Sequence, residues 1–200
     1  MQLHFLGKQA ASDQFVVAQT CRFEPFKAKA LSYIMKKSKE TTEEIIGLIM
    51  KKLGLTLAVA ESCTGGLLCH KITNVSGSSK YFRGGVVAYH NDLKENILGV
   101  PKVILKKFGA VSKETAMAMA HGAKEKIGCN VGLAITGITG PTGGSKTKPV
   151  GTIFIAIAGE TNEKSQRFLF KGSRQNIKLL TTNKALKMLK EFLLNTDKKR

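Results

Sequence analysis

The stretch LTLAVAESCTGGL, residues 55–67, decides the fold of this chain. Its first six residues form a short apolar run, which is typical of a strand buried inside a sheet. Two consecutive glycines, Gly65 and Gly66, then allow a sharp turn, and residues 67–72 have the pattern of a helix. A strand that turns sharply into a helix brings side chains and backbone N–H groups to the carboxyl end of a sheet. The stretch therefore predicts an α/β fold with a functional site at this turn.

Helical and strand patterns alternate on both sides of this stretch. Residues 41–44 have the pattern of a capping box, Gly54 that of a helix end, and Ser112 that of an N-cap. The expected strands cover residues 55–60, 86–89, 130–135, 150–158 and 167–170, and the expected helices cover residues 41–53, 67–72, 93–97, 112–127 and 174–194, with one more opened by Pro101. Interleaved strands and helices with one late hairpin predict the α/β class, as a three-layer α/β/α domain with a mixed sheet.

The composition narrows the class of protein. The chain has 200 residues, enough for one domain with its own core, and no segment approaches the roughly 18 apolar residues that cross a bilayer. The four cysteines include no C-x-x-C pair, so the sequence indicates neither a zinc site nor a disulfide scaffold. We expect a soluble cytoplasmic protein with reduced thiols, no metal ion and no membrane partner.

The formal net charge of +18 raises the question of nucleic-acid binding. Within residues 50–53 and 187–190, lysines alternate with apolar residues at helical spacing, as on solvated helix faces. The sequence contains no tryptophan and no basic stripe rich in aromatic residues that could stack bases. Nucleic acid is therefore the least favoured partner, although the charge would attract anionic small molecules.

Residues 1–38 differ from the rest of the chain. They show no sustained hydrophobic period, and they resemble neither an Arg- and Ser-rich transit peptide nor a secretory signal. We expect a poorly ordered N-terminal extension over residues 1–38 and a folded domain over residues 39–200.

The first candidate for chemistry is Ser62 in the turn at residues 61–66. A serine at a sharp strand-to-helix turn has its hydroxyl lifted out of the sheet, beside N–H groups of the first helical turn. The N–H groups of Thr64, Gly65 and Gly66 could hold an oxyanion. The alternative is that Ser62 or Thr64 only caps the helix and the glycines only permit the turn. The six residues by themselves favour this structural alternative.

A nucleophilic serine needs a base, and the sequence places no histidine well for that role. Lys94 is the better candidate, since it follows the segment that begins at Tyr89. A lysine acts as a base only when burial lowers its pKa by roughly 3 units. A solvated surface lysine is the common alternative, and spacing does not decide between the two.

The glycine-rich loop over residues 136–145 is the third candidate. Consecutive glycines and hydroxyl residues after a strand form a nest of N–H donors suited to phosphate. The loop contains neither a Walker A motif nor a dinucleotide fingerprint. Arg174, at the start of the last expected helix, could add bidentate charge to the same phosphate. The alternatives are a flexible surface loop and an ordinary exposed arginine.

Several motifs in register resemble those of one known family. They are A-E-S-C-T-G-G at 60–66, F-R-G-G-V-V-A-Y-x-N-x-x-K at 82–94, G-A-V-S-x-E at 109–114, A-I-T-G-I-T-G-P-T-G-G at 134–144 and K-P-V-G-T at 148–152. Together they resemble the CinA carboxy-terminal domain family, whose characterised members are nicotinamide-nucleotide amidases. The resemblance covers about residues 40–194 and implies an amidase domain of α/β/α fold over residues 39–200. It also implies hydrolysis of nicotinamide mononucleotide to nicotinate mononucleotide and ammonia, without a cofactor.

The resemblance assigns roles by position. It makes Ser62 the nucleophile and Lys94 the base, and it places Tyr89 within reach of the site. Glu61 would orient Lys94 or face the pyridinium ring, or else lie as a carboxylate at the helix N-terminus. Cys63 is an alternative nucleophile, although we expect its side chain to point into the core. The substrate and phosphate side would comprise Glu61, Thr136, Gly137, Gly140, Gly144 and Arg174.

The chain departs from the family pattern at Thr139, where alanine is usual, and at Thr142, where an acidic or small residue is common. Both changes fall on the loop and bear on affinity more than on chemistry. The family also suggests a homodimer. The main alternative to an enzyme is a non-catalytic nucleotide-binding module that acts as a sensor or scaffold.

Overall fold

The computed structural model describes residues 40–195 of the chain. The expectation of a poorly ordered extension over residues 1–38 lies outside the described residues. None of the helices between residues 40 and 195 combines the length and apolar character needed to cross a membrane.

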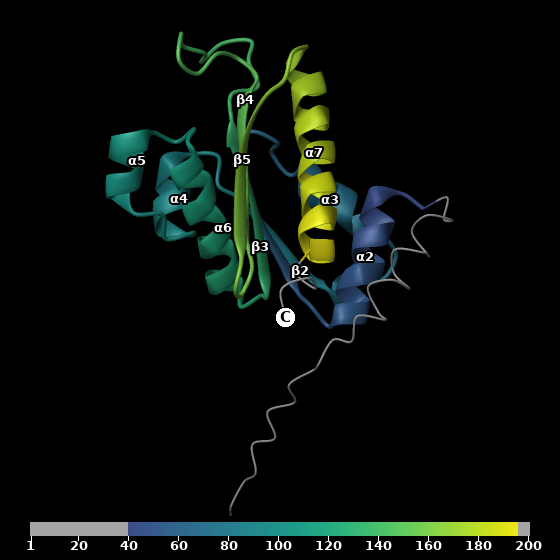
Figure 1. Ribbon diagram of the computed structural model, residues 1–200. Helices are drawn as coiled ribbons and strands as arrows, with labels where there is room; N and C mark the ends of the chain where they lie inside the picture. The colour runs from purple at the N-terminus through teal and green to yellow at the C-terminus, as the bar shows by residue number, and fades with distance from the viewer. Residues whose placement is uncertain (1–39, 196–200) are drawn as a thin grey trace, which may run out of the picture.

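The centre of the domain is a five-stranded mixed sheet, seen nearly edge-on in Figure 1. Its strands follow the order β2-β1-β3-β4-β5. β1 pairs in parallel with both β2 and β3, whereas β3–β4 and β4–β5 are antiparallel. The strands are β1 (Leu57–Glu61), β2 (Phe82–Val87), β3 (Val131–Gly137), β4 (Thr152–Ala158) and β5 (Glu163–Leu169). Because β1, β2 and β3 are parallel neighbours, their carboxyl ends lie at one edge of the sheet.

Helices cover both faces of the sheet, which confirms the three-layer α/β/α prediction (Figure 1). One layer holds α4 (Asn91–Asn96), α5 (Lys102–Phe108) and α6 (Lys113–Ile127), and the other holds α2 (Thr42–Leu53), α3 (Leu67–Thr73) and α7 (Arg174–Asn195). A short 3-10 helix, η1 (Ser78–Lys80), precedes β2. α2 begins with the predicted capping box at Thr41 and ends at the predicted Gly54, which adopts a positive φ of 64°.

The two faces of the sheet carry side chains of different size. Alternation along β1, β3 and β4 sends leucine, valine and isoleucine toward α2, α3 and α7, and sends alanine toward α6. Small side chains let α6 approach the sheet closely. A Cβ atom on Gly132 of β3 would overlap the carbonyl oxygen of Ala120 in α6. This close packing fixes the segment just before α6, which lies beside the candidate site.

The sequence placed β2 too late. It predicted a strand over residues 86–89, but the strand runs over Phe82–Val87 and the chain leaves it before Tyr89. Gly84 and Gly85, which the prediction left outside the strand, belong to β2, an edge strand of the sheet. The absence of a Cβ on Gly85 also leaves room for the Cys69 thiol of α3.

Candidate active site

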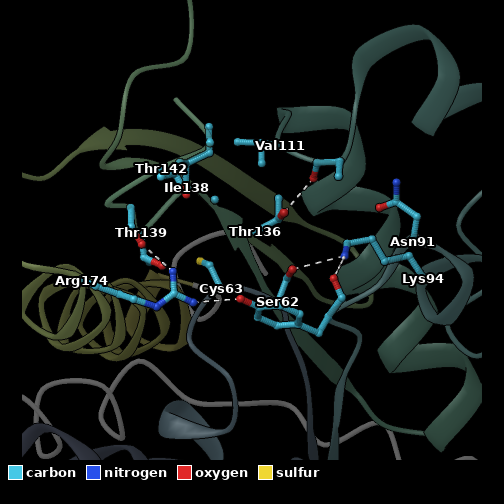
Figure 2. Close-up of a pocket in the computed structure, with 15 residues that line it drawn as sticks. Ser62, Cys63, Asn91, Lys94, Val111, Thr136, Ile138, Thr139, Thr142 and Arg174 are labelled. Carbon is cyan, nitrogen blue, oxygen red and sulfur yellow. Dashed lines mark hydrogen bonds between the residues drawn. The ribbon is translucent and has the colours of Figure 1, made fainter. Parts of the chain in front are cut away.

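A pocket of about 280 Å³ opens where the three parallel strands end (Figure 2). Ser62 follows β1, Tyr89 follows β2, and Thr136 and Gly137 complete β3. The pocket is lined by Ser62, Cys63, Tyr89, Asn91, Lys94, Ala110, Val111, Thr136, Gly137, Ile138, Thr139, Gly140, Thr142, Gly143 and Arg174. Its volume is near the lower end for small-molecule sites, and its lining includes no aspartate or glutamate from the described residues.

The main chain holds the Ser62 turn between the two neighbouring strands. The Ser62 N–H donates to the Ile135 carbonyl oxygen of β3 at 3.0 Å. The Glu61 carbonyl oxygen accepts from the Ala88 N–H, just beyond β2, at 2.8 Å. Ser62 thus extends the sheet pairing by one residue before the chain turns, which fixes its side chain at the sheet edge.

Lys94 is almost completely buried, with 1% of its surface exposed. Its Nζ lies 3.2 Å from Ser62 Oγ (Figure 2). The same nitrogen lies 2.7 Å from the Ala88 carbonyl oxygen and 3.2 Å from the Tyr89 carbonyl oxygen. Within residues 40–195, Lys94 forms no ion pair with a carboxylate. Burial lowers the pKa of Lys94 from its ordinary value because the ammonium form loses hydration. An ionised Cys63 thiolate would raise it, but burial itself raises the pKa of Cys63 to about 12.

The three contacts of Lys94 suit both of its protonation states. A neutral amine donates its two N–H groups to the two carbonyl oxygens and turns its lone pair to the Ser62 hydroxyl. An ammonium donates to the same three oxygens. A proton can therefore move between Oγ and Nζ without any rearrangement of their surroundings, as general-base catalysis requires.

Glu61 lies away from the pocket and holds the first turn of α3. Its side chain is fully buried, and its carboxylate accepts the N–H groups of Gly66 at 2.9 Å, Leu68 at 3.2 Å and Cys69 at 2.8 Å. The carboxylate therefore neither orients Lys94 nor faces a substrate ring. The alternative interpretation, a carboxylate at the helix N-terminus, is correct.

The same contacts correct the predicted oxyanion donors. The Gly66 N–H binds Glu61, and the Gly65 N–H donates to the Ser62 carbonyl oxygen at 3.2 Å. Neither N–H is free to hold an oxyanion. In the part of the chain that the structure describes, the N–H groups of Cys63 and Thr64 donate no hydrogen bond to another residue. Cys63 also lines the pocket, so its N–H is a donor that the sequence reasoning overlooked.

The Cys63 thiol is buried among core residues and also reaches the pocket wall, between Ser62 and Arg174 in Figure 2. The expectation that it points into the core is thus half right. Because burial raises its pKa to about 12, the thiol stays protonated near neutral pH. A protonated thiol is a weak nucleophile, so Ser62 is the better candidate.

The glycine-rich loop forms the wall opposite α4, but not all of its predicted residues face the pocket. Thr136 is buried and donates its hydroxyl proton to the Ala110 carbonyl oxygen at 2.7 Å, so it has no proton to offer a phosphate. Gly137 and Gly140 line the pocket as predicted. Gly144 does not line it; a Cβ there would lie 2.7 Å from the Val150 nitrogen, so its small size serves loop packing.

Arg174 joins two walls of the pocket. Its Nη1 donates to the Gly140 carbonyl oxygen at 2.6 Å, and its Nη2 donates to the Tyr89 hydroxyl at 2.8 Å (Figure 2). Tyr89 is 59% exposed, so this pair lies at the mouth of the pocket. Two of the five guanidinium N–H groups are used, which leaves others for an anion.

Sequence reasoning missed part of the lining, namely Asn91, Ala110, Val111, Ile138, Thr139, Thr142 and Gly143 as binding residues. All seven lie within the motifs at 82–94, 109–114 and 134–144, but the motifs do not show which side chains reach the pocket. Ala110 and Val111 precede Ser112, the N-cap of α6. No local pattern predicts that this segment meets the end of β3. The hydrogen bond from Thr136 to Ala110 joins residues that are distant in sequence and that only the fold brings together.

The chain is similar to several known proteins. A model of the CinA C-terminal domain matches residues 39–193. A CinA-like protein of Geotalea daltonii is 50% identical over 155 residues, which are 78% of this chain and 38% of that protein. A CinA-like protein of Geobacter sp. strain M21 is 38% identical over 193 residues, which are 96% of this chain and 46% of that protein. The chain therefore spans less than half the length of these curated relatives.

Solved structures give the same result. The crystal structure of a competence/damage inducible protein from Agrobacterium tumefaciens superposes with a TM-score of 0.71 at 40% identity, covering 78% of this chain and 97% of that one. A competence-damaged protein (CinA) superfamily protein from Escherichia coli gives a TM-score of 0.73 at 30% identity, covering 80% and 91%. The family model and the solved structures agree: the chain belongs to the CinA family and contains its C-terminal domain.

Proposed function

We propose that this domain hydrolyses the carboxamide of nicotinamide mononucleotide to nicotinate mononucleotide and ammonia. The observation that carries the proposal is the buried Lys94 amine, with its lowered pKa, 3.2 Å from the Ser62 hydroxyl. A buried lysine without a carboxylate partner is costly to keep charged, and such groups concentrate at functional sites. The family resemblance of the motifs supplies the choice of substrate.

The first chemical step is attack by Ser62. Lys94 takes the hydroxyl proton while Oγ forms a bond to the carboxamide carbon. The carbonyl oxygen becomes an oxyanion, and the free N–H groups of Cys63 and Thr64 are the donors best suited to bind it. An N–H of the residue after the nucleophile serves this role at other strand-to-helix turns.

The second step releases ammonia. Lys94 passes its proton to the leaving nitrogen, the C–N bond breaks, and an ester of Ser62 remains. Lys94 then takes a proton from water as the water oxygen attacks the ester carbon, the C–Oγ bond breaks, and Lys94 returns the proton to Ser62 Oγ as the carboxylic acid leaves. Lys94 needs no other residue for these transfers, because both of its protonation states have complete hydrogen bonding in place.

The rest of the pocket suits an anionic nucleotide. Arg174 and the loop at residues 137–143 line one side, and no acidic side chain of the described residues opposes a phosphate there. The unused guanidinium N–H groups of Arg174 and the backbone of the loop would bind the phosphate. Gly137 and Gly140 keep the loop narrow at the base of this wall, since a Cβ on either would meet Ile153 or Val150.

Ammonia release by three variants tests the proposal. Ser62→Ala and Lys94→Ala should each lower kcat by roughly a thousandfold or more, because each removes a participant in the covalent step. Cys63→Ala should keep most of the activity, since its thiol is protonated. Loss of activity in Cys63→Ala together with retention in Ser62→Ala would assign the nucleophile to the thiol instead.

The same variants distinguish the enzyme from the alternative, a non-catalytic nucleotide-binding module. Such a module would bind nicotinamide mononucleotide saturably in calorimetry without releasing ammonia, and its affinity would tolerate Lys94→Ala. Under the amidase proposal, Ser62→Ala still binds the nucleotide while wild type turns it over.

A further inference from the structure

Asn91 is a polar residue of the pocket for which the proposed mechanism has no role. It is the first residue of α4, and its side chain lines the pocket on the Lys94 side, across from Arg174 (Figure 2). Asn91 and Lys94 are three positions apart, so they lie on the same face of the helix. The Asn91 amide makes no hydrogen bond to any residue between 40 and 195, whereas Lys94, Thr136 and Arg174 all have partners.

The proposed function restricts where the leaving nitrogen can lie. Lys94 must return a proton to that nitrogen, so the nitrogen has to come within hydrogen-bond distance of Nζ. A carboxamide nitrogen carries two N–H groups that need hydrogen-bond acceptors. Asn91 is exposed to solvent, so its amide is accessible to an incoming substrate. The nearby carbonyl oxygens of Ala88 and Tyr89 are already bound by Lys94. The lining offers no carboxylate from the described residues, which leaves the Asn91 amide oxygen as the unpaired acceptor on that side.

We infer that Asn91 is the residue that binds the leaving nitrogen, with its Oδ1 accepting one N–H of the substrate carboxamide. This inference rests on the proposed function. The hydrogen bond orients the carboxamide so that its nitrogen faces Lys94 and its oxygen faces the turn after Ser62. Asn91 exchanges no proton: the Ser62 proton travels through Lys94 to the nitrogen, and ammonia leaves as Oγ becomes an ester oxygen.

A substrate without an N–H on its leaving group isolates this contact. The methyl ester of nicotinate mononucleotide has the same acyl group, ring and phosphate, but an oxygen leaving group. Asn91→Ala should lower kcat/KM for nicotinamide mononucleotide by about tenfold, the effect of one hydrogen bond. For the ester the change should stay within about threefold.

Two further variants make the result independent of how much protein is folded. Asn96→Ala, at the exposed end of the same helix and outside the pocket, should leave the ratio of amide to ester hydrolysis unchanged. Asn91→Asp keeps an acceptor oxygen at the same place and should restore that ratio to within about threefold of wild type. Misfolding lowers both rates together and leaves the ratio intact.

Each outcome decides the assignment. Equal losses for amide and ester in Asn91→Ala overturn the role of Asn91 while leaving the amidase proposal in place. A ratio that Asn91→Asp fails to restore also overturns it, because an acceptor would then be insufficient. Wild-type protein that cleaves neither compound overturns the proposed function, and the assignment of Asn91 with it.

Discussion

Lys94 shows how the surroundings of a side chain change its protonation. Its ammonium would normally be solvated, but α4 directs the side chain under the end of β2, where only neutral acceptors meet it. Without a carboxylate partner, burial favours the neutral amine and lowers the pKa of Lys94. The same two carbonyl oxygens that satisfy the amine also aim its lone pair at Ser62.

The pH dependence of activity follows from this shift. The base is active when neutral, so kcat/KM should rise with pH through the pKa of Lys94 and then level off. Because burial lowers that pKa, the midpoint should lie below the ordinary lysine value of about 10.4. A pH–rate profile of ammonia release measures it. A midpoint at the ordinary lysine value would contradict the claim that Lys94 is buried and acts as the base.

At the residue scale, the sequence predicted which residues line the pocket better than it predicted the hydrogen bonds that they form. Ser62, Tyr89, Lys94 and Arg174 lie around one pocket as their motifs predict, although their chemical roles stay predictions. The error over Glu61 arose because a carboxylate beside a serine can face either way. Only the path of the main chain beyond Glu61 shows that its carboxylate binds the N–H groups of Leu68 and Cys69 in α3 and of Gly66, the N-cap of that helix. Asn91 lay within a recognised motif, but nothing local marks its amide as unpaired.

At the element scale, α3 depends on a residue outside its own span. The N-cap of α3, Gly66, has no side chain, so the helix lacks the usual capping hydroxyl or amide. Glu61, the last residue of β1, supplies the missing acceptor and ties strand to helix across the turn that carries Ser62. The position of Ser62 therefore depends on this junction.

Glu61→Gln tests the junction. A neutral amide accepts these N–H groups more weakly and turns its own N–H toward them, so the free energy of unfolding should fall by roughly 2 kcal/mol. Urea denaturation followed by circular dichroism measures the change. Glu125→Gln, at an exposed position of α6, serves as the matched control and should be nearly neutral. Equal stability of both variants would show that the Glu61 carboxylate contributes nothing beyond its shape.

The contact between α6 and the sheet supports the opposite wall of the pocket. α6 lies close to the sheet because Gly132 presents only a hydrogen to the Ala120 carbonyl oxygen. Ala110 and Val111, just before α6, line the pocket, and Thr136 binds this segment at the end of β3. A displacement of α6 would therefore move Ala110 and Val111, and with them this wall of the pocket.

Gly132→Ala should show this coupling. The added methyl group meets main-chain atoms of Ala120, which can yield only if α6 shifts as a whole. The free energy of unfolding should therefore fall by about 1–3 kcal/mol. Activity of the folded protein should fall as well, measured as kcat at a temperature where the variant stays folded. Lys126→Ala, on the exposed side of α6, should change neither quantity appreciably. Full activity in a destabilised Gly132→Ala would mean that the helix and the pocket wall move independently.

At the scale of the whole molecule, the fold class could be predicted because local patterns and layer architecture agree. Buried apolar strands interleaved with capped helices permit few arrangements, and the late hairpin marks the sheet as mixed. Patterns could not predict the spatial order of the strands, in which β1 lies between β2 and β3. That order brings the three parallel strand ends together, so the site depends on the one feature that the sequence pattern leaves open.

The overall charge gives a prediction at the same scale. A formal net charge of +18, with Arg174 at the mouth of the pocket and no acidic lining among the described residues, should attract a phosphorylated substrate over distance. Salt screens this attraction, so kcat/KM for the mononucleotide should fall by about threefold or more between roughly 0.05 and 0.5 M sodium chloride. The unphosphorylated nicotinamide riboside, which is cationic, should lose none of its lower activity over the same range. Parallel losses for both compounds would place the salt effect on the folded protein instead of on the approach of the phosphate, and the positive charge would then have no part in substrate capture.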